Sequence, residues 1–256
     1  SLDPAEEPPV ALYPAEGSAL EAVKSVDGVI ALFSRLFESG HVPFSLAPVE
    51  GGRAIAFETD TSMGKESYAI GFGDAITIRA ATATGRQYAL TVLAQMLSAA
   101  REKGSAFRFP ASGTIEDAPR YGWRGTHLDV SRQFYETADL LRLIDILAWH
   151  RMNIFHWHLT DDEAWRLEIR AYPALTEIGA TRAPGTKMPP QLGNGAKPVR
   201  GFYSQDEVRT VVAHAAALGI DVIPEVDIPG HATAALAALP ELADGQEAPE
   251  SYHSVQ

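Results

Sequence analysis

The second half of the chain alternates strand-like and helix-like segments, and this alternation limits the folds that it can adopt. Apolar runs of strand length cover residues 123–130, 154–159 and 220–226. Amphipathic helical patterns fill the two intervals between them, over 137–151 and 204–218. The order strand, helix, strand, helix, strand predicts parallel βαβ units with right-handed crossovers, and therefore an α/β fold.

Local signals mark the ends of the helical segments. Thr137 is the expected N-cap of the first helix. Ser204 stands three residues before Glu207, which is the pattern of a capping box, and Gly219 ends the second helix. The adjacent acids Asp206 and Glu207 are therefore interpreted as residues of a helix start and not as a catalytic pair.

Charged side chains follow each of the three strand-like runs. The carboxyl ends of the strands form the active-site face of a parallel barrel, so these side chains are candidates for binding or catalysis. They are Arg132 after the first run, Asp161, Asp162 and Glu163 after the second, and Glu225, Asp227 and His231 at the end of the third.

The first part of the chain predicts a separate small α/β domain. Its expected elements are a helix over 29–37, strands over 54–58, 67–72 and 75–80, and a helix over 85–100. Residues 104–119 contain Gly, Ser, Pro and mixed charges and are interpreted as a linker. We therefore expect a small α/β domain at residues 1–115 and the beginning of a barrel at residues 116–256.

Composition and charge exclude several classes of partner. The 256 residues carry a formal net charge of -12 and form no basic cluster, which argues against a nucleic acid or an anionic membrane as partner. No apolar run reaches the roughly 20 residues that span a bilayer. The absence of cysteine excludes disulfides and thiolate metal sites. Any secretion signal is expected to have been removed, and among the possible compartments we favour the periplasm or the exterior.

Motifs in both halves match those of a known enzyme family. In the second half they are Leu128-Asp129-Val130-Ser131-Arg132, His156-Trp157-His158-Leu159-Thr160-Asp161-Asp162 and Pro224-Glu225-Val226-Asp227-Ile228-Pro229-Gly230-His231. In the first half they lie within 64–70, 76–80 and 85–90. Together and in this order they resemble glycoside hydrolase family 20, the β-N-acetylhexosaminidases. The resemblance implies a small α/β domain followed by the first part of a (β/α)8 TIM barrel, with about three βα units present.

The resemblance also implies an activity and a set of site residues. Enzymes of this family remove terminal β-linked N-acetylhexosamine, either GlcNAc or GalNAc, from oligosaccharides, including those of chitin, or from glycoconjugates. They use a retaining, substrate-assisted mechanism in which a Glu protonates the leaving oxygen and an Asp orients the 2-acetamido group of the substrate. This chemistry needs no metal and no other cofactor. The matching positions assign sugar binding to Arg132, Asp161 and His231, and supporting roles to Asp162, Glu225 and Asp227.

One part of the family pattern has no match. In the family, the catalytic Asp-Glu pair follows the fourth barrel strand after a His-x-Gly-Gly-like segment, which does not occur before Gln256. We therefore expect the pair beyond Gln256, and the remaining strands from the same or another chain. Three βα units alone are expected to expose Val222, Ile223 and Val226.

Two other functions stay open. One is a metal-dependent barrel hydrolase that uses His156, His158 and Asp227, although buried hydrogen-bonded histidines are commoner than a His-x-His metal pair. The other is a non-catalytic fragment that binds an amino sugar through the three sugar-binding residues named above.

Some of the singled-out residues also have a simpler interpretation. Asp162-Glu163 is expected at the surface or rim of the site, and Arg132 with Asp161 would form a structural ion pair without the resemblance. The tryptophans Trp123, Trp149 and Trp157 are expected in the core, and Trp165 either as a sugar platform or as filling at the rim. Residues 183–201 are expected to form a long loop at the active face.

Overall fold

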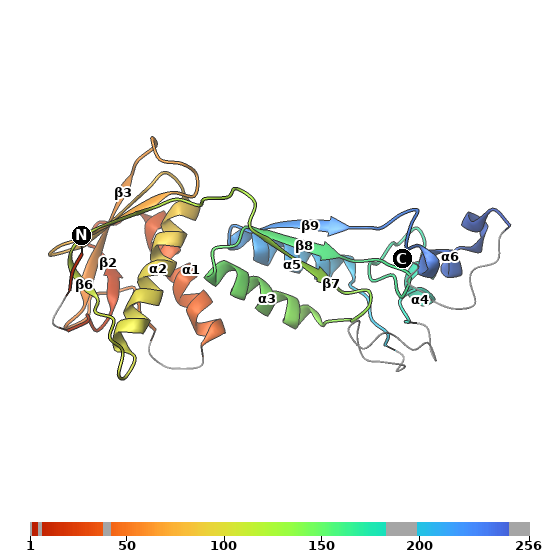
Figure 1. The fold of residues 1–256 in the computed structure, drawn as a ribbon, viewed down its shortest axis with the longest axis horizontal. Coiled ribbons are helices and arrows are strands. Elements are labelled where there is room, and N and C mark those ends of the chain that lie inside the picture. Colours follow the sequence, from red (N-terminus) through yellow and green to blue (C-terminus); the bar gives the residue numbers. More distant parts are fainter. Residues whose placement is uncertain (1, 5–6, 38–41, 183–198, 246–256) are drawn as a thin grey trace. The chain divides into compact units, whose positions relative to one another are not determined.

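A computed structural model describes residues 2–4, 7–37, 42–182 and 199–245, which form two compact units (Figure 1). Unit 1 is Ser1–Gly122 and unit 2 is Trp123–Gln256, and each is described by itself. Most of the loop expected over 183–201 lies outside the described residues. No helix in the described part of the chain is both long enough and apolar enough to cross a bilayer.

Unit 1 is a mixed sheet with two helices. The sheet has the strand order β1-β6-β4-β5-β3-β2. Its strands are β1 (Leu2–Pro4), β2 (Leu12–Pro14), β3 (Arg53–Thr59), β4 (Tyr68–Phe72), β5 (Ile76–Ala80) and β6 (Pro110–Asp117). The helices α1 (Leu20–Leu36) and α2 (Ala83–Arg101) pack against each other, and α2 also contacts β4 and β5. Alternate residues of β5, namely Ile76, Ile78 and Ala80, are buried, as expected for a strand with one face on a core.

Two expectations for unit 1 are wrong. The helix expected to begin at residue 29 begins at Leu20, because Ala22 and Val26 extend its buried stripe by two turns. The segment interpreted as a linker contains β6, which pairs with β4 in antiparallel register. The expected boundary after residue 115 therefore falls inside a strand of unit 1.

Unit 2 contains a parallel three-stranded sheet in the order β7-β8-β9 (Figure 1). Its strands are β7 (Gly125–Asp129), β8 (Ile154–His158) and β9 (Asp221–Glu225), and its long helices are α3 (Thr137–Trp149) and α5 (Gln205–Ala217). The short helices are α4 (Ala174–Glu177), α6 (Thr233–Ala238) and the 3-10 turn η2 (Pro240–Ala243). The order β7-α3-β8 and then α5-β9 confirms the predicted βαβ succession.

Burial differs between the strands of this sheet. The central strand β8 is buried, with Phe155 and Trp157 fully enclosed. Strand β9 forms one edge of the sheet among the described residues, and the expected exposure is confirmed for Ile223 and Val226. Ile223 is 38% and Val226 is 41% exposed. A strand at a sheet edge has a neighbour on one side only, so less of its surface is covered.

The tryptophans of unit 2 divide between core and surface. Trp157 belongs to the core as predicted, and Trp149 is half-buried. Trp123 is 65% exposed, so its placement in the core is wrong. Trp165 is buried and packs with Leu175 in a small cluster with α6, which supports the filling role and not the sugar platform.

The two long helices begin with different caps. The capping box of α5 is confirmed, because Ser204 Oγ accepts from the Glu207 N–H at 3.2 Å and Glu207 Oε2 accepts from the Ser204 N–H at 2.9 Å. Gly219 has a positive φ of 73°, as expected for the residue that ends this helix. The N-cap of α3 is Glu136 and not Thr137. The Thr137 hydroxyl instead donates to Glu207 Oε1 at 3.0 Å, which links the starts of the two helices.

Replacing Ser204 with alanine is expected to lower the free energy of unfolding by about 1 kcal/mol, because the α5 cap loses its side-chain acceptor. Thr210→Ala is the matched control, since the Thr210 hydroxyl bonds to a backbone carbonyl on the exposed side of the same helix. Urea unfolding measures both effects. Equal stabilities of the two variants would contradict the capping role.

Candidate functional site

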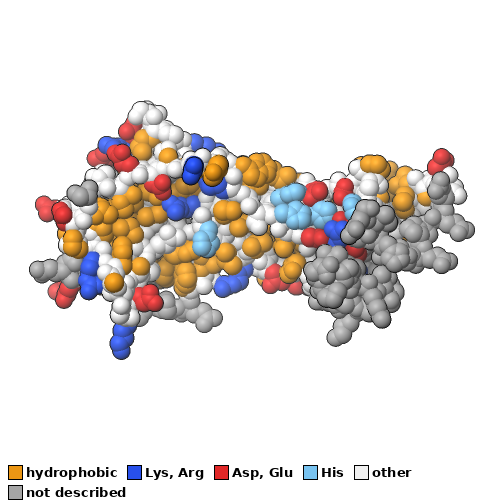
Figure 2. Space-filling model, in the orientation of Figure 1, with side chains coloured by type: hydrophobic (Ala, Val, Ile, Leu, Met, Phe, Trp, Pro, Cys, Tyr) orange, Lys and Arg blue, Asp and Glu red, His pale blue; other side chains and the backbone are white. Residues whose placement is uncertain are grey.

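Charged side chains and histidines gather at the carboxyl ends of β7, β8 and β9. In the register of the sheet Asp129 lies beside His158, and His158 lies beside Glu225. The segments that follow these three strand ends supply Arg132, Asp161 and the later residues of the cluster. Figure 2 shows the histidines of this region as one patch with acidic side chains next to it.

Arg132 lies among three carboxylates. Its Nη1 is 2.9 Å from Asp129 Oδ2 and 2.5 Å from Asp161 Oδ2, and its Nε is 2.7 Å from Glu163 Oε2. Burial would lower the pKa of Arg132, but the charges of Glu163, Asp129 and Asp161 raise it above its usual value. The guanidinium is therefore permanently charged, and its side chain keeps 16% of its surface exposed.

Asp161 is almost completely buried and is held from several sides. Its Oδ2 accepts from His158 Nε2 at 2.9 Å, and its Oδ1 accepts from the Asp162 N–H at 2.6 Å and lies 3.1 Å from His231 Nδ1. Burial favours the neutral carboxyl, but these bonds and the charge on Arg132 lower the pKa of Asp161 below its usual value. Asp161 is thus a fixed anion that connects Arg132, His158 and His231.

His158 has a carboxylate at each ring nitrogen. Nε2 bonds to Asp161, and Nδ1 lies 2.9 Å from Glu225 Oε2. Burial would lower the pKa of His158, but bonding to Asp161 and Glu225 and the charge of Asp129 raise it to about 9. His158 was not among the sugar-binding residues predicted from the sequence. Its spacing of three residues from Asp161 is the signal that could have indicated this pairing.

Asp162 and Glu163 are buried, so the interpretation of this pair as surface or rim residues is wrong. Asp162 Oδ1 accepts from the Thr233 backbone N–H at 3.1 Å and from its hydroxyl at 2.6 Å, and Asp162 Oδ2 lies 3.1 Å from His231 Nδ1. Glu163 faces Arg132. Each carboxylate can be buried because a partner compensates it. Asp162 thereby ties the segment after β9 to the end of β8.

The other supporting residues approach the cluster from β9. Glu225 at the end of β9 contacts His158 as described, and the backbone N–H of Asp227 donates to Thr160 Oγ1 at 2.9 Å. The donor atoms of Asp227, His158 and Asp161 lie within 4.8 Å of one another. All six residues predicted for the site therefore lie at this end of the sheet.

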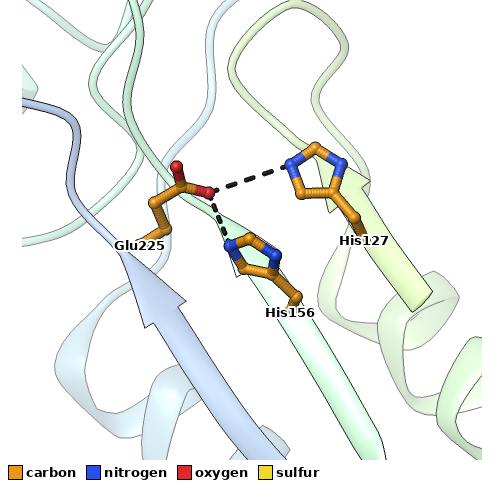
Figure 3. Close-up of side chains that lie close together, drawn as sticks. All are labelled: His127, His156 and Glu225. Atoms are coloured by element: carbon orange, nitrogen blue, oxygen red, sulfur yellow. Dashed lines mark ion pairs between the residues drawn. The ribbon is translucent and has the colours of Figure 1, made fainter. Parts of the chain in front are cut away.

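Several groups of side chains in this region have the composition of a metal site. His127, His156 and Glu225 form one such group (Figure 3), and His158, Asp161 and Asp227 form another. The structure divides the predicted set of His156, His158 and Asp227 between these two groups.

The distances around Glu225 are those of ion pairs. Glu225 Oε2 lies 2.6 Å from His156 Nε2 and 2.9 Å from His158 Nδ1. Two ligands of one tetrahedral zinc ion, each at about 2.0–2.1 Å, would be separated by about 3.3 Å. Direct pairing of Glu225 with the imidazoles therefore accounts for these contacts better than a shared ion does.

Comparison with known proteins identifies the family. Residues 121–256, slightly more than half of the chain, match the family described as "Glycosyl hydrolase family 20, catalytic domain", and residues 21–118 match "Glycosyl hydrolase family 20, domain 2". The chain belongs to glycoside hydrolase family 20. The family resemblance inferred from the motifs is thereby confirmed. The expected fold, an α/β domain followed by part of a TIM barrel, is confirmed as well.

Relatives in family 20 include both sequences and solved structures. A β-hexosaminidase of Vibrio furnissii is 40% identical over 207 residues, which cover 80% of this chain and 33% of that protein. The Vibrio harveyi exo-β-N-acetylglucosaminidase, solved with N-acetylglucosamine, has a TM-score of 0.72 at 32% identity. The match covers 94% of this chain and 37% of the Vibrio chain. The Streptomyces plicatus N-acetyl-β-hexosaminidase, solved with Thio-NAglucal, has a TM-score of 0.75 at 32% identity. The match covers 100% of this chain and 50% of the Streptomyces chain. The chain thus spans between a third and a half of the length of these family 20 proteins.

The low pKa of Asp161 in this family 20 chain predicts a loss of stability in acid. A carboxyl whose pKa is lower in the folded state stabilises that state above its unfolded pKa of about 3.9, and the contribution disappears as the pH falls through the folded pKa. We expect the free energy of unfolding to decrease below about pH 4 more steeply for the wild type than for Asp161→Asn. Denaturant unfolding at several pH values measures both slopes, and equal slopes would contradict the role of Asp161 as a fixed anion.

Proposed function

We propose that the protein carrying this chain is a β-N-acetylhexosaminidase, which removes terminal β-linked N-acetylhexosamine from an oligosaccharide or glycoconjugate. The observation that carries this proposal is the convergence of Arg132, Asp161 and His231 at the carboxyl ends of three parallel strands in a family 20 chain. The ends of barrel strands are where the active sites of such folds lie.

Arg132 is the proposed contact to the sugar hydroxyls. Its fixed donors match neighbouring hydroxyl groups, and the surrounding carboxylates hold the guanidinium in one orientation. His231 is half-exposed beside it and can also reach a ligand. Asp161 is 2% exposed, so it acts through Arg132 and His231 and does not need to touch the sugar itself.

The proposed mechanism is retaining and substrate-assisted. The 2-acetamido oxygen of the substrate attacks the anomeric carbon while a Glu protonates the leaving oxygen, and water then opens the cyclic intermediate. Two inversions at the same carbon restore the β configuration. None of residues 1–256 is assigned to the Asp-Glu pair of this mechanism.

Hydrolysis by the full-length protein tests the proposal. We expect it to cleave the para-nitrophenyl β-glycoside of N-acetylglucosamine and not that of glucose, because glucose lacks the acetamido nucleophile. NMR of the first product is expected to show the β anomer. Equal cleavage of both glycosides, or an α product, would contradict the mechanism.

Sugar binding without hydrolysis is the second candidate for the chain of residues 1–256. It is favoured because the proposed sugar contacts lie in this chain, whereas the catalytic pair has no assignment in it. A protein made of residues 1–256 that binds N-acetylglucosamine saturably and forms no product would support this candidate.

A further inference from the structure

His158 lies at the centre of a row of alternating charges that ends at the proposed sugar contact. The row runs from Glu225 at the end of β9 through His158 on β8 to Asp161, and from Asp161 to Arg132. We propose that His158 is a positioning residue that stays positively charged at neutral pH and holds Asp161, and through it Arg132, in the orientation that binds the amino sugar. The inference rests on the function proposed above and assigns to it a residue that the family resemblance did not assign.

The positions of the two ring nitrogens favour the charged form of His158. Nε2 needs its proton in order to donate to Asp161 Oδ2 at 2.9 Å. A neutral ring with this proton would leave Nδ1 unprotonated 2.9 Å from Glu225 Oε2, where the partial negative charge of the nitrogen and the charge of the carboxylate repel each other. Protonation at both nitrogens turns this repulsion into an attraction.

The groups that surround His158 have a net negative charge. Asp129 from β7, Asp161 after β8 and Glu225 from β9 are carboxylates, and Arg132 is the one permanent cation that faces the ring among the residues that the structure describes. The ring of His127 lies 5.4 Å away, and burial together with its histidine neighbours lowers the pKa of His127. His158 therefore holds the proton in preference to His127.

The charge on His158 affects the sugar contact because both partners use the same oxygen of Asp161. Asp161 Oδ2 lies 2.9 Å from His158 Nε2 and 2.5 Å from Arg132 Nη1. If the ring loses its charge, its charge-assisted bond to this oxygen becomes at most a neutral hydrogen bond, which holds the oxygen less firmly. The carboxylate can then rotate, and Arg132 loses the orientation that it needs for the sugar hydroxyls.

The first test is the pH dependence of N-acetylglucosamine binding by the full-length protein, measured calorimetrically. The wild type is expected to lose affinity as the pH rises through about 9. In Glu225→Gln the histidine loses one of its two carboxylates, so we expect the same loss at a lower pH. A merely structural role for Glu225 would weaken binding equally at every pH.

Removal of the imidazole gives a second comparison. His158→Gln is expected to bind the sugar about tenfold more weakly at neutral pH, since a charge-assisted bond to Asp161 is lost. His214→Gln is the matched control, because His214 Nε2 pairs with Asp145 at the same 2.9 Å between α5 and α3, away from the site. Equal affinities of the two variants would overturn the inference.

Heteronuclear NMR of labelled histidine tests the charge independently of sugar binding. The His158 signals, assigned by their absence from His158→Gln, are expected to show protons on both ring nitrogens at about pH 8. One bare nitrogen at that pH, or an unshifted binding profile in Glu225→Gln, would overturn the inference while leaving the proposed function intact. Absence of sugar binding in the wild type would overturn the proposed function and the positioning role, and NMR would still determine the charge.

Discussion

Arg132→Ala is expected to lower the free energy of unfolding by about 3–5 kcal/mol, because it removes one member of a buried charge cluster. Asp161 and Glu163 are almost fully buried and would lose their main compensating cation. In the full-length protein we also expect a lower kcat/KM, equivalent to a loss of about 1–3 kcal/mol in transition-state stabilisation, and a higher KM. Urea unfolding and steady-state kinetics measure the two effects.

Two further variants separate charge from geometry at this position. Arg132→Lys keeps the positive charge and is expected to recover most of the stability, but it lacks the planar fork that suits two hydroxyls and should remain a weak binder. Arg209→Ala is the control, since Arg209 pairs with Asp206 on the exposed surface of α5 and should change stability by less than about 1 kcal/mol. Unchanged stability and unchanged kcat/KM in Arg132→Ala would remove Arg132 from both roles.

Arg166→Met is expected to have a comparable or larger effect on folding, with a loss of at least about 4 kcal/mol in the free energy of unfolding. Arg166 is fully buried, and its guanidinium donates to four backbone carbonyls at 2.7–3.0 Å. The acceptors are the carbonyl oxygens of Val130, Ser131, Ala180 and Gly201. Methionine fills similar space but leaves these carbonyls without their donor.

The exposed Arg170 provides the control for this substitution, because within the described part of the chain its guanidinium has only a long contact of 3.8 Å to Glu168. Arg170→Met is expected to unfold at the same urea concentration as the wild type. A small effect of Arg166→Met would mean that the segments joined by Arg166 are held by other contacts. The side chain would then not be the tie between the end of β7 and the residues around 180 and 201.

The regular elements were predictable where local signals determine them. Helix α5 has its capping box and its closing glycine within the segment itself, and β8 is an apolar run of strand length. Strand β6 was missed because its Gly, Ser and Pro content is typical of a linker, whereas its formation depends on pairing with β4, about forty residues earlier. The cap of α3 was misplaced by one residue because both Glu136 and Thr137 can serve as caps.

Motifs in the sequence predicted which residues form the candidate site, but they did not predict how deeply these residues are buried. Arg132, Asp161 and His231 each follow a strand, and the parallel sheet brings such positions together. The burial of Glu163 could not be predicted from its neighbours in the sequence, because it depends on the Arg132 side chain, which follows another strand. The position of His158 between two carboxylates depends in the same way on Glu225, which lies 67 residues later in the chain.

The dissociation constant of N-acetylglucosamine, measured by calorimetry on the full-length wild type and on Arg132→Lys, tests the sugar site most directly. We predict saturable binding by the wild type and an affinity at least about tenfold lower in the variant at unchanged overall charge. Equal affinities, or no saturable binding by the wild type, would contradict the assignment of this cluster as an amino-sugar site.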